Sequence, residues 1–165
     1  MDRKFVIEDA SFIVSVLNPL DTFHKDAIET LRIIDKASFE TTYVLPEIAL
    51  CETVFTLMKN GVNPEKIRNG INKLTMLPRV IIASAGIMTV LRYASRFLNI
   101  LSLEQNQMNI TKTQDYLIAC SSVDYGGLLL TSDKKMEKTV ICKNLPCYNF
   151  SKVSARKQLE KELLS

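Results

Sequence analysis

The chain has 165 residues, of which 47% are hydrophobic and 24% are charged. A chain of this length can bury a core without disulfides or a structural metal. This balance excludes a disordered protein, and the lack of an apolar run of about 18 residues excludes a membrane-spanning helix. A net charge of +3 permits an anionic partner such as RNA without requiring one. We therefore expect one domain over residues 1–165.

The N-terminal segment MDRKFVIEDA has acids where a signal peptide has its apolar stretch, so we expect a cytoplasmic protein with no membrane partner. The four cysteines form no CxxC pair, and His24 is the single histidine that could complete a set of zinc ligands, so a zinc site is not expected. Cys51 and Cys120 fall within helical patterns, where a reduced cysteine packs as a small hydrophobe. We expect both to be buried.

The chain begins with an apolar strand at residues 4–8, followed by Asp9-Ala10-Ser11, which has the chemistry of a strand end and a helix cap. Taken alone, Asp9 is explained as an N-cap. Apolar residues at helical spacing predict an amphipathic helix over 21–37. His24 lies on this helix, and we expect it at an exposed or core-edge position and not as a catalytic base.

A β-branched and aromatic segment predicts the second strand at residues 41–45, after which Pro46 opens a helix that stops at Asn60-Gly61. The predicted apolar stripe of this helix consists of Ile48, Cys51, Phe55 and Met58. Glu52 lies four residues after Ile48 and three before Phe55, so it should project from the buried face or its edge. Buried carboxylates almost always have a partner, which makes Glu52 a candidate site residue.

Residues 64–74 predict a further helix, 79–83 the third strand, and 86–101 another helix, with a loop over 102–110. Arg92 and Arg96 lie off the apolar stripe of the 86–101 helix. They form either a solvated face or, if this face borders the site, contacts to phosphates.

The segment 111–136 predicts a helix, a turn and a strand with an acid at each end. Thr113 can cap the helix and places Asp115 in its first turn, where the helix dipole favours an acid. The helix stops at 125–127, and an apolar strand at 128–130 leads into Thr131-Ser132-Asp133. In a parallel sheet, residues just past the end of a strand lie on the edge where ligands bind.

Lys134 and Lys135 come shortly after this strand. Two later segments are candidates for the last strand, 139–142 and 147–150, and we favour 147–150. A charged amphipathic helix of about 152–164 closes the chain, with Lys152, Arg156 and Lys157 facing either an anion or water. Strands alternate with helices throughout. This pattern predicts an α/β fold, a parallel sheet covered on both faces.

Four acids should therefore converge on the carboxyl edge of one sheet: Asp9, Glu52, Asp115 and Asp133. Their mutual repulsion costs several kcal/mol unless divalent cations neutralise it. Oxygen ligands without cysteine or histidine suit Mg²⁺ or Mn²⁺ and disfavour Zn²⁺. Such a site can activate water against a phosphodiester.

The order of VIEDAS, LPEIALCETVF and QDYLIACSSVDYGGLLLTSDKKM resembles the PIN domain, a family of metal-dependent ribonucleases that includes the toxins of VapBC toxin-antitoxin pairs. The resemblance covers nearly the whole chain and lies in the order and spacing of short motifs. It implies a three-layer α/β/α PIN-like fold with a parallel sheet of about five strands flanked by helices.

Carried over residue by residue, the resemblance assigns Asp9, Glu52, Asp115 and Asp133 to the four acidic catalytic and metal-site positions, and Ser11 and Thr131 to the supporting hydroxyls. It implies Mg²⁺ or Mn²⁺ as cofactor, single-stranded RNA as substrate, a homodimer, and an antitoxin partner if the protein is a toxin. Lys134, Lys135, Arg92 and Arg96 are candidate RNA contacts.

The chain departs from the family at two points. It is longer than the compact toxins, with extra length around 97–111 and 137–150. After the last motif it has Lys-Lys-Met-Glu where many relatives have an acid followed by an aromatic residue, so Glu137 is not counted among the ligands.

Two alternatives stay open. One is a non-catalytic PIN-like module that binds RNA or protein, although the presence of all four acids argues against a degenerate site. The other is a phosphatase or receiver-type domain built around Asp9, which is weaker because the residue two positions later is Ser11 and not a second aspartate.

Overall fold

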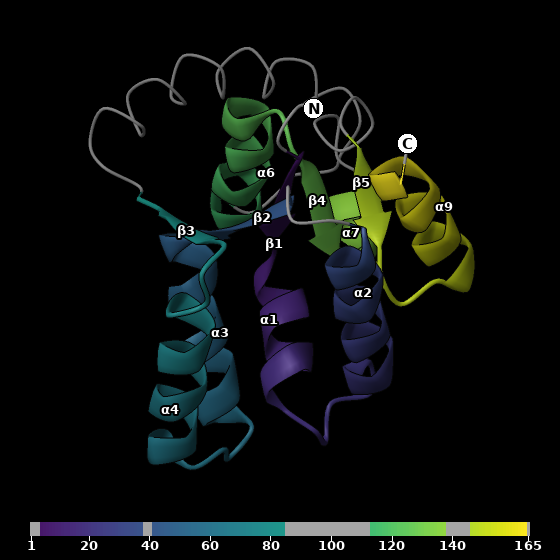
Figure 1. The fold of residues 1–165 in the computed structure, drawn as a ribbon. Coiled ribbons are helices and arrows are strands. Elements are labelled where there is room, and N and C mark those ends of the chain that lie inside the picture. Colours follow the sequence, from purple (N-terminus) through teal and green to yellow (C-terminus); the bar gives the residue numbers. More distant parts are fainter. Residues whose placement is uncertain (1–3, 38–40, 85–112, 138–145, 165) are drawn as a thin grey trace.

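A computed structural model describes residues 4–37, 41–84, 113–137 and 146–164, with a five-stranded parallel sheet flanked by helices (Figure 1). The strands occur in the order β3-β2-β1-β4-β5 across the sheet. Their bounds are β1 Lys4–Glu8, β2 Thr41–Pro46, β3 Val80–Ala83, β4 Leu128–Thr131 and β5 Cys147–Asn149. All four strand pairs are parallel. The expected fold class and the five predicted strands are confirmed.

Five of the described helices follow the predicted segments, whereas the sequence pattern predicted no bounds for the helices at 10–17 and 134–137. The helix bounds are α1 Ala10–Leu17, α2 His24–Lys36, α3 Glu47–Lys59, α4 Pro64–Thr75, α6 Thr113–Tyr125, α7 Lys134–Glu137 and α9 Val153–Leu164. None of these helices is long and apolar enough to cross a membrane. The segments predicted at 86–101, 102–110 and 139–142 lie outside the described residues, as do Arg92 and Arg96.

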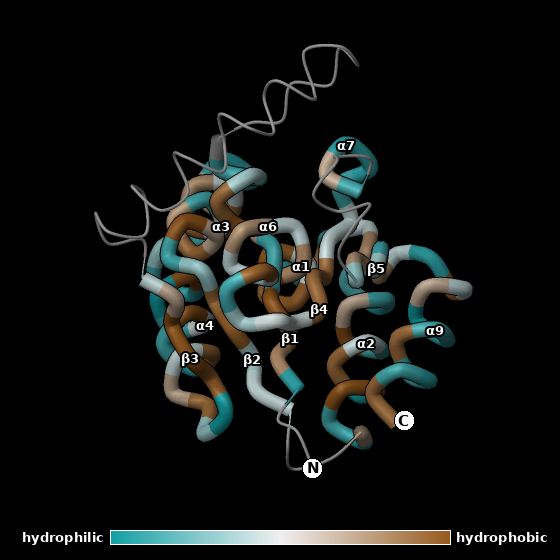
Figure 2. The backbone as a smooth tube through the Cα atoms, turned by 90° about the horizontal axis from the view of Figure 1, so that it is seen from above, coloured by the Kyte–Doolittle hydropathy of each residue, from teal (hydrophilic) through white to brown (hydrophobic). Residues whose placement is uncertain are grey.

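The sheet separates two buried clusters of side chains because successive residues of a strand point to opposite faces. Ile7 packs with residues of α3, α4 and α6, whereas Val6 packs with residues of α2 and α9. Helix α1 starts directly after β1 and contributes to both clusters, through Ile13 on one side and Phe12 on the other. Seen from above, α3 and α4 lie toward the β3 end of the sheet, and α2 and α9 toward the β5 end (Figure 2).

Helix α9 is fixed to the domain by polar contacts as well as by apolar packing. Lys4 Nζ, on β1, donates to the carbonyl oxygens of Glu162 and Leu163 at the end of the helix, at 2.6 and 3.2 Å. Arg156 is 6% exposed and forms ion pairs with Asp26 and Glu29 of α2. Of the two alternatives that the sequence left open, Arg156 therefore faces anionic groups, the carboxylates of α2, and not water.

The predicted apolar stripe of α3 is also wrong. Cys51, Phe55 and Met58 are exposed, with Phe55 at 72%, and the buried residues of the helix are Ala49, Thr53 and Leu57. Small side chains lie beneath α3 because it packs closely against α1, whereas hydrophobicity alone favoured the larger residues. Cys51 is therefore not part of the core, although Cys120 is.

The turn between α6 and β4 needs both of its glycines, for different reasons. Gly126 has a φ of +59°, the left-handed conformation that commonly ends a helix. Gly127 lies against β1, where a Cβ atom would be 2.7 Å from the carbonyl oxygen of Phe5 and in collision with Cδ1 of Ile7. This close approach allows β4 to pair with β1.

We expect Gly127→Ala to lower the free energy of unfolding by about 3 kcal/mol, because the added methyl meets backbone that cannot move aside. Gly61→Ala is the matched control. Gly61 has a φ of +74° but nothing within 4 Å of an added Cβ, so only about 1 kcal/mol should be lost. Urea unfolding followed by circular dichroism measures both. Equal losses would contradict the proposed clash.

Candidate functional site

A cleft of about 310 Å³ opens at the carboxyl ends of the strands, and all four predicted acids line it. Asp9 directly follows β1, and Asp133 comes two residues after β4. Glu52 projects from α3, and Asp115 lies in the first turn of α6. Four elements that are distant in sequence therefore bring their carboxylates to one edge of the sheet, as the sequence pattern predicts.

Asp9 is 4% exposed and is the best-anchored acid of the cleft. Its Oδ1 accepts from the backbone N–H of Ala10, and its Oδ2 accepts from the hydroxyls of Ser11 and Thr131, each at 2.7 Å. Burial raises the pKa of Asp9, while these hydrogen bonds act in the opposite direction. The carboxylate is thus held in one orientation, and it also caps α1, the role that the sequence alone suggested.

Ser11 and Thr131, the two predicted supporting hydroxyls, connect Asp9 to the turn after β4. Thr131 Oγ1 accepts from the backbone N–H of Asp133, and Ser11 Oγ accepts from the backbone N–H of Ser132, both at 2.9 Å. Asp133 in turn accepts from the N–H of Lys135 through Oδ1, at 2.6 Å, and so begins α7. The same hydroxyls that orient Asp9 therefore position the backbone that carries Asp133.

Glu52 and Asp115 are half-buried. Glu52 lies beside Thr53 of the buried row of α3, and its Oε2 atom is enclosed within the protein. The expectation that Glu52 projects from the edge of the buried face is met, although the stripe used to predict it was wrong. Asp115 occupies the first turn of α6, where the helix dipole favours a carboxylate.

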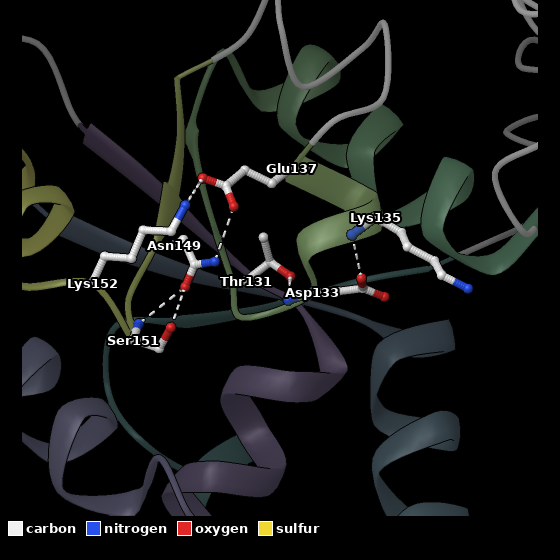
Figure 3. A network of polar contacts seen from close by, with 7 residues as sticks. All are labelled: Thr131, Asp133, Lys135, Glu137, Asn149, Ser151 and Lys152. Atoms are coloured by element: carbon white, nitrogen blue, oxygen red, sulfur yellow. Dashed lines mark hydrogen bonds and ion pairs between the residues drawn. The ribbon is translucent and has the colours of Figure 1, made fainter. Parts of the chain in front are cut away.

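Glu137 lies outside this cleft. Its carboxylate accepts from Asn149 Nδ2 at 3.0 Å and from Lys152 Nζ at 2.6 Å, and Figure 3 shows it directed toward these residues and away from Asp133. Lys135 is exposed, and its ammonium group extends away from the Asp133 carboxylate. Neither Lys134 nor Lys135 lines the cleft, so both stay candidate RNA contacts at its margin.

Sequence reasoning missed several residues that line the cleft, above all Asp21, Phe23, Ser15 and Asn60. Asp21 is a fifth acid there. Its Oδ1 accepts from Ser15 Oγ at 2.8 Å and from the N–H of Phe23 at 2.9 Å. The Asn-Pro-Leu-Asp-Thr sequence signals a turn, but it gives no sign that this turn folds back onto the cleft.

Glu8 is a second acid that the sequence pattern left unexamined. It ends β1, is 1% exposed, and its Oε1 has no hydrogen-bond partner among the described residues. Burial raises the pKa of Glu8 to about 8. Since Glu8 and Asp9 are adjacent, one edge of the sheet contains two acids with different surroundings, one hydrogen-bonded and one enclosed.

The donors in the cleft are carboxylates, hydroxyls and amides, with no cysteine or histidine, a set that suits a hard divalent cation. In the described part of the chain, however, no group of three or more His, Cys, Asp or Glu residues is arranged to hold a metal ion. The chemistry of the donors therefore fits Mg²⁺ or Mn²⁺, and joint coordination requires side-chain rotations.

Comparison with solved structures identifies the architecture. A chain of VapBC2 from Rickettsia felis, in a complex bound to a DNA fragment from their promoter, aligns with a TM-score of 0.64 over 88% of this chain and 98% of that chain, at 16% sequence identity. VapC20 of Mycobacterium tuberculosis, a sarcin-ricin loop cleaving toxin, aligns with a TM-score of 0.60 over 82% and 97%, at 13% identity. The chain has the fold of the VapC proteins.

No family model matches the sequence. No curated protein matches it either. The VapC-like fold is therefore established by structure alone, in agreement with the PIN-like architecture that the motifs implied.

Thr131→Val should lower the free energy of unfolding by about 2 kcal/mol, because it removes one hydrogen bond to Asp9 and one from the Asp133 backbone. Ser132→Ala is the control, since no described residue bonds to the Ser132 hydroxyl, and its effect should stay within about 0.5 kcal/mol. Chemical denaturation provides the measurement. An unchanged Thr131→Val protein would show that the hydroxyl does not support the site.

The free energy of unfolding should fall as the pH rises from 4.5, the ordinary pKa of a glutamate, toward about 8, the pKa of Glu8 in the fold. The folded protein holds this proton more tightly than the unfolded chain, so deprotonation opposes folding. One pKa unit corresponds to about 1.4 kcal/mol. Denaturation at a series of pH values should show a shallower decline for Glu8→Gln, whereas the exposed-site control Glu65→Gln should follow the wild type. Superimposable profiles for all three would contradict the assignment.

Proposed function

We propose that the protein is a divalent-metal-dependent endoribonuclease that cleaves single-stranded RNA. The observation that carries this proposal is the gathering of Asp9, Glu52, Asp115 and Asp133 on one cleft at the carboxyl edge of the sheet. The cleavage of the sarcin-ricin loop by VapC20, a protein of the same fold, supports the choice of RNA as substrate.

Asp9, Asp115 and Asp133 would hold Mg²⁺ or Mn²⁺, directly or through water, with Glu52 as a further ligand or a group that orients the attacking water. When bound, the cation supplies an activated water and stabilises charge on the leaving oxygen. Ser11 and Thr131 hold the Asp9 carboxylate in place by donating to its Oδ2.

The partners expected from the PIN resemblance stay proposals. The PIN resemblance includes the toxins of VapBC toxin-antitoxin pairs, and the fold is shared with a chain of VapBC2, so we propose an antitoxin partner for this chain. A homodimer through helices of the middle region is proposed from the PIN resemblance. The RNA target is proposed only as a class, single-stranded RNA.

The test is cleavage of a labelled, mostly single-stranded RNA by the purified protein with Mn²⁺ or Mg²⁺. We expect cleavage that EDTA abolishes and that Asp9→Asn, Asp115→Asn, Asp133→Asn and Glu52→Gln each reduce by at least about 100-fold, with the fold intact by circular dichroism. Glu65→Gln, which changes an exposed acid outside the cleft, should cleave like the wild type.

Full activity of Asp115→Asn would contradict the assignment of that ligand. RNA binding without cleavage, unaffected by EDTA, would favour the non-catalytic binding module.

A further inference from the structure

Phe23 is an exposed aromatic residue inside the acidic cleft. It precedes α2 and lines the same cleft as the four predicted acids, and 36% of its surface is exposed. It is the one aromatic side chain among the described residues that line this cleft. Because an aromatic ring is usually buried, a ring left open beside a reactive site needs a reason.

The Phe23 ring is held in position. It packs edge-on with Phe150, with ring centroids 6.4 Å apart and an interplanar angle of 85°. Phe150 is fully buried and packs in the same manner against Phe12 at 4.9 Å. The backbone N–H of Phe23 donates to Asp21, which Ser15 also holds. The ring is therefore ordered before any ligand arrives, which reduces the entropy lost on binding.

The charges of the cleft make an uncharged contact necessary. The charged residues that line it in the described part of the chain are all acids, the four predicted ones and Asp21. An RNA strand that enters this cleft meets no lysine or arginine among the described residues of its walls, and these acids repel its phosphates. Binding there must draw on a cation at the acids and on contacts to the bases. Stacking on an aromatic ring is such a contact and does not depend on the charge of the strand.

A second cavity adjoins the cleft. It has a volume of about 760 Å³, shares Asp21 and Asn60 with the cleft and reaches Lys66 on α4. Asn18, 9% exposed, lines this cavity; its Oδ1 accepts from the N–H of Leu20, and no described residue accepts from its Nδ2. Amide donors and a lysine are groups that bind base edges and phosphates. Because the two cavities share Asp21 and Asn60, a strand bound in the cleft has the second cavity directly beside it.

We propose that Phe23 is a stacking platform for a base of single-stranded RNA next to the phosphate held at the acids, and that the strand continues past Asn60 into the second cavity. The inference rests on the proposed ribonuclease function and adds a substrate-positioning residue to it. Phe23 contacts the base and takes no part in the chemical step.

The first test uses the absence of tryptophan from the sequence. Phe23→Trp introduces a single indole into the cleft, and Phe55→Trp is the matched control, because Phe55 is exposed on α3 and lines neither cavity. Both are made in the Asp115→Asn background so that the RNA stays intact. With Mg²⁺, which does not itself quench indole fluorescence, a single-stranded RNA hexamer should quench the fluorescence of the Phe23→Trp protein and leave that of the Phe55→Trp protein unchanged. A hexamer of abasic ribose should quench neither.

The second test is kinetic. Phe23→Leu should lower kcat/KM for single-stranded RNA by about tenfold, mainly through KM, because it keeps an apolar side chain but removes the π-face. Phe23→Tyr should retain nearly full activity, and Phe55→Leu should match the wild type. Thermal unfolding of each variant separates a stacking role from the packing of Phe23 against Phe150.

Two failures are distinguishable. If the wild type cleaves RNA but Phe23→Leu matches it, or the hexamer does not quench the Phe23→Trp protein, the stacking proposal is overturned and the ribonuclease stands. If the wild type cleaves no RNA but the Phe23→Trp protein is still quenched, the ribonuclease proposal fails and base stacking stands.

A third outcome also overturns the stacking proposal. If the cleft accepts a polypeptide, the fluorescence of the Phe23→Trp protein changes with a protein partner and not with RNA.

Discussion

The carboxylate of Asp9 is the contact on which the site depends, because it joins the ends of the neighbouring strands β1 and β4. The carboxylate accepts hydrogen bonds from Ser11, in the helix that follows β1, and from Thr131, at the end of β4. The backbone repeats this link, since the N–H of Asp9 donates to the carbonyl of Leu130 at 3.1 Å. These contacts fix the start of α1, the turn after β4 and the backbone of Asp133.

Two neighbouring acids show how the fold treats buried charge. Burial raises the pKa of Asp9, and the hydrogen bonds that it accepts oppose this shift because they favour the ionised form, which is the form that can bind a cation. Glu8 points to the opposite face of the strand and is fully enclosed, so its neutral form is favoured up to about pH 8. A buried acid without hydrogen bonds at Oε1 lowers stability. The destabilising residue, Glu8, is therefore the direct neighbour of Asp9 in the site.

The fold and the positions of Asp9, Asp115 and Asp133 could be predicted because their signals are local, whereas Glu52 was inferred from an apolar stripe that the structure contradicts. Strand ends followed by Asp9 and Thr-Ser-Asp133, and a helix opened by Asp115, are visible in the sequence itself. The buried face of α3 could not be predicted, because close packing against α1 selects Ala49 and Thr53 over the more hydrophobic Phe55. The same holds for Asp21, Phe23 and Arg156. Asp21 contacts α1, Phe23 contacts Phe150 just after β5, and Arg156 contacts α2. No periodicity in the sequence indicates such contacts.

The strand order also has a consequence for how the chain acquires its structure. β1 is made first but lies between β2 and β4, and Asp9 meets Thr131 across 122 positions of sequence. During synthesis the apolar β1 can pair with β2 early, yet its other edge has no native neighbour until β4 emerges. Non-local pairing of this kind is slow and leaves a strand edge open to wrong partners. The acidic cleft, which requires both strands, is therefore assembled only late in folding, so a partly synthesised chain lacks it.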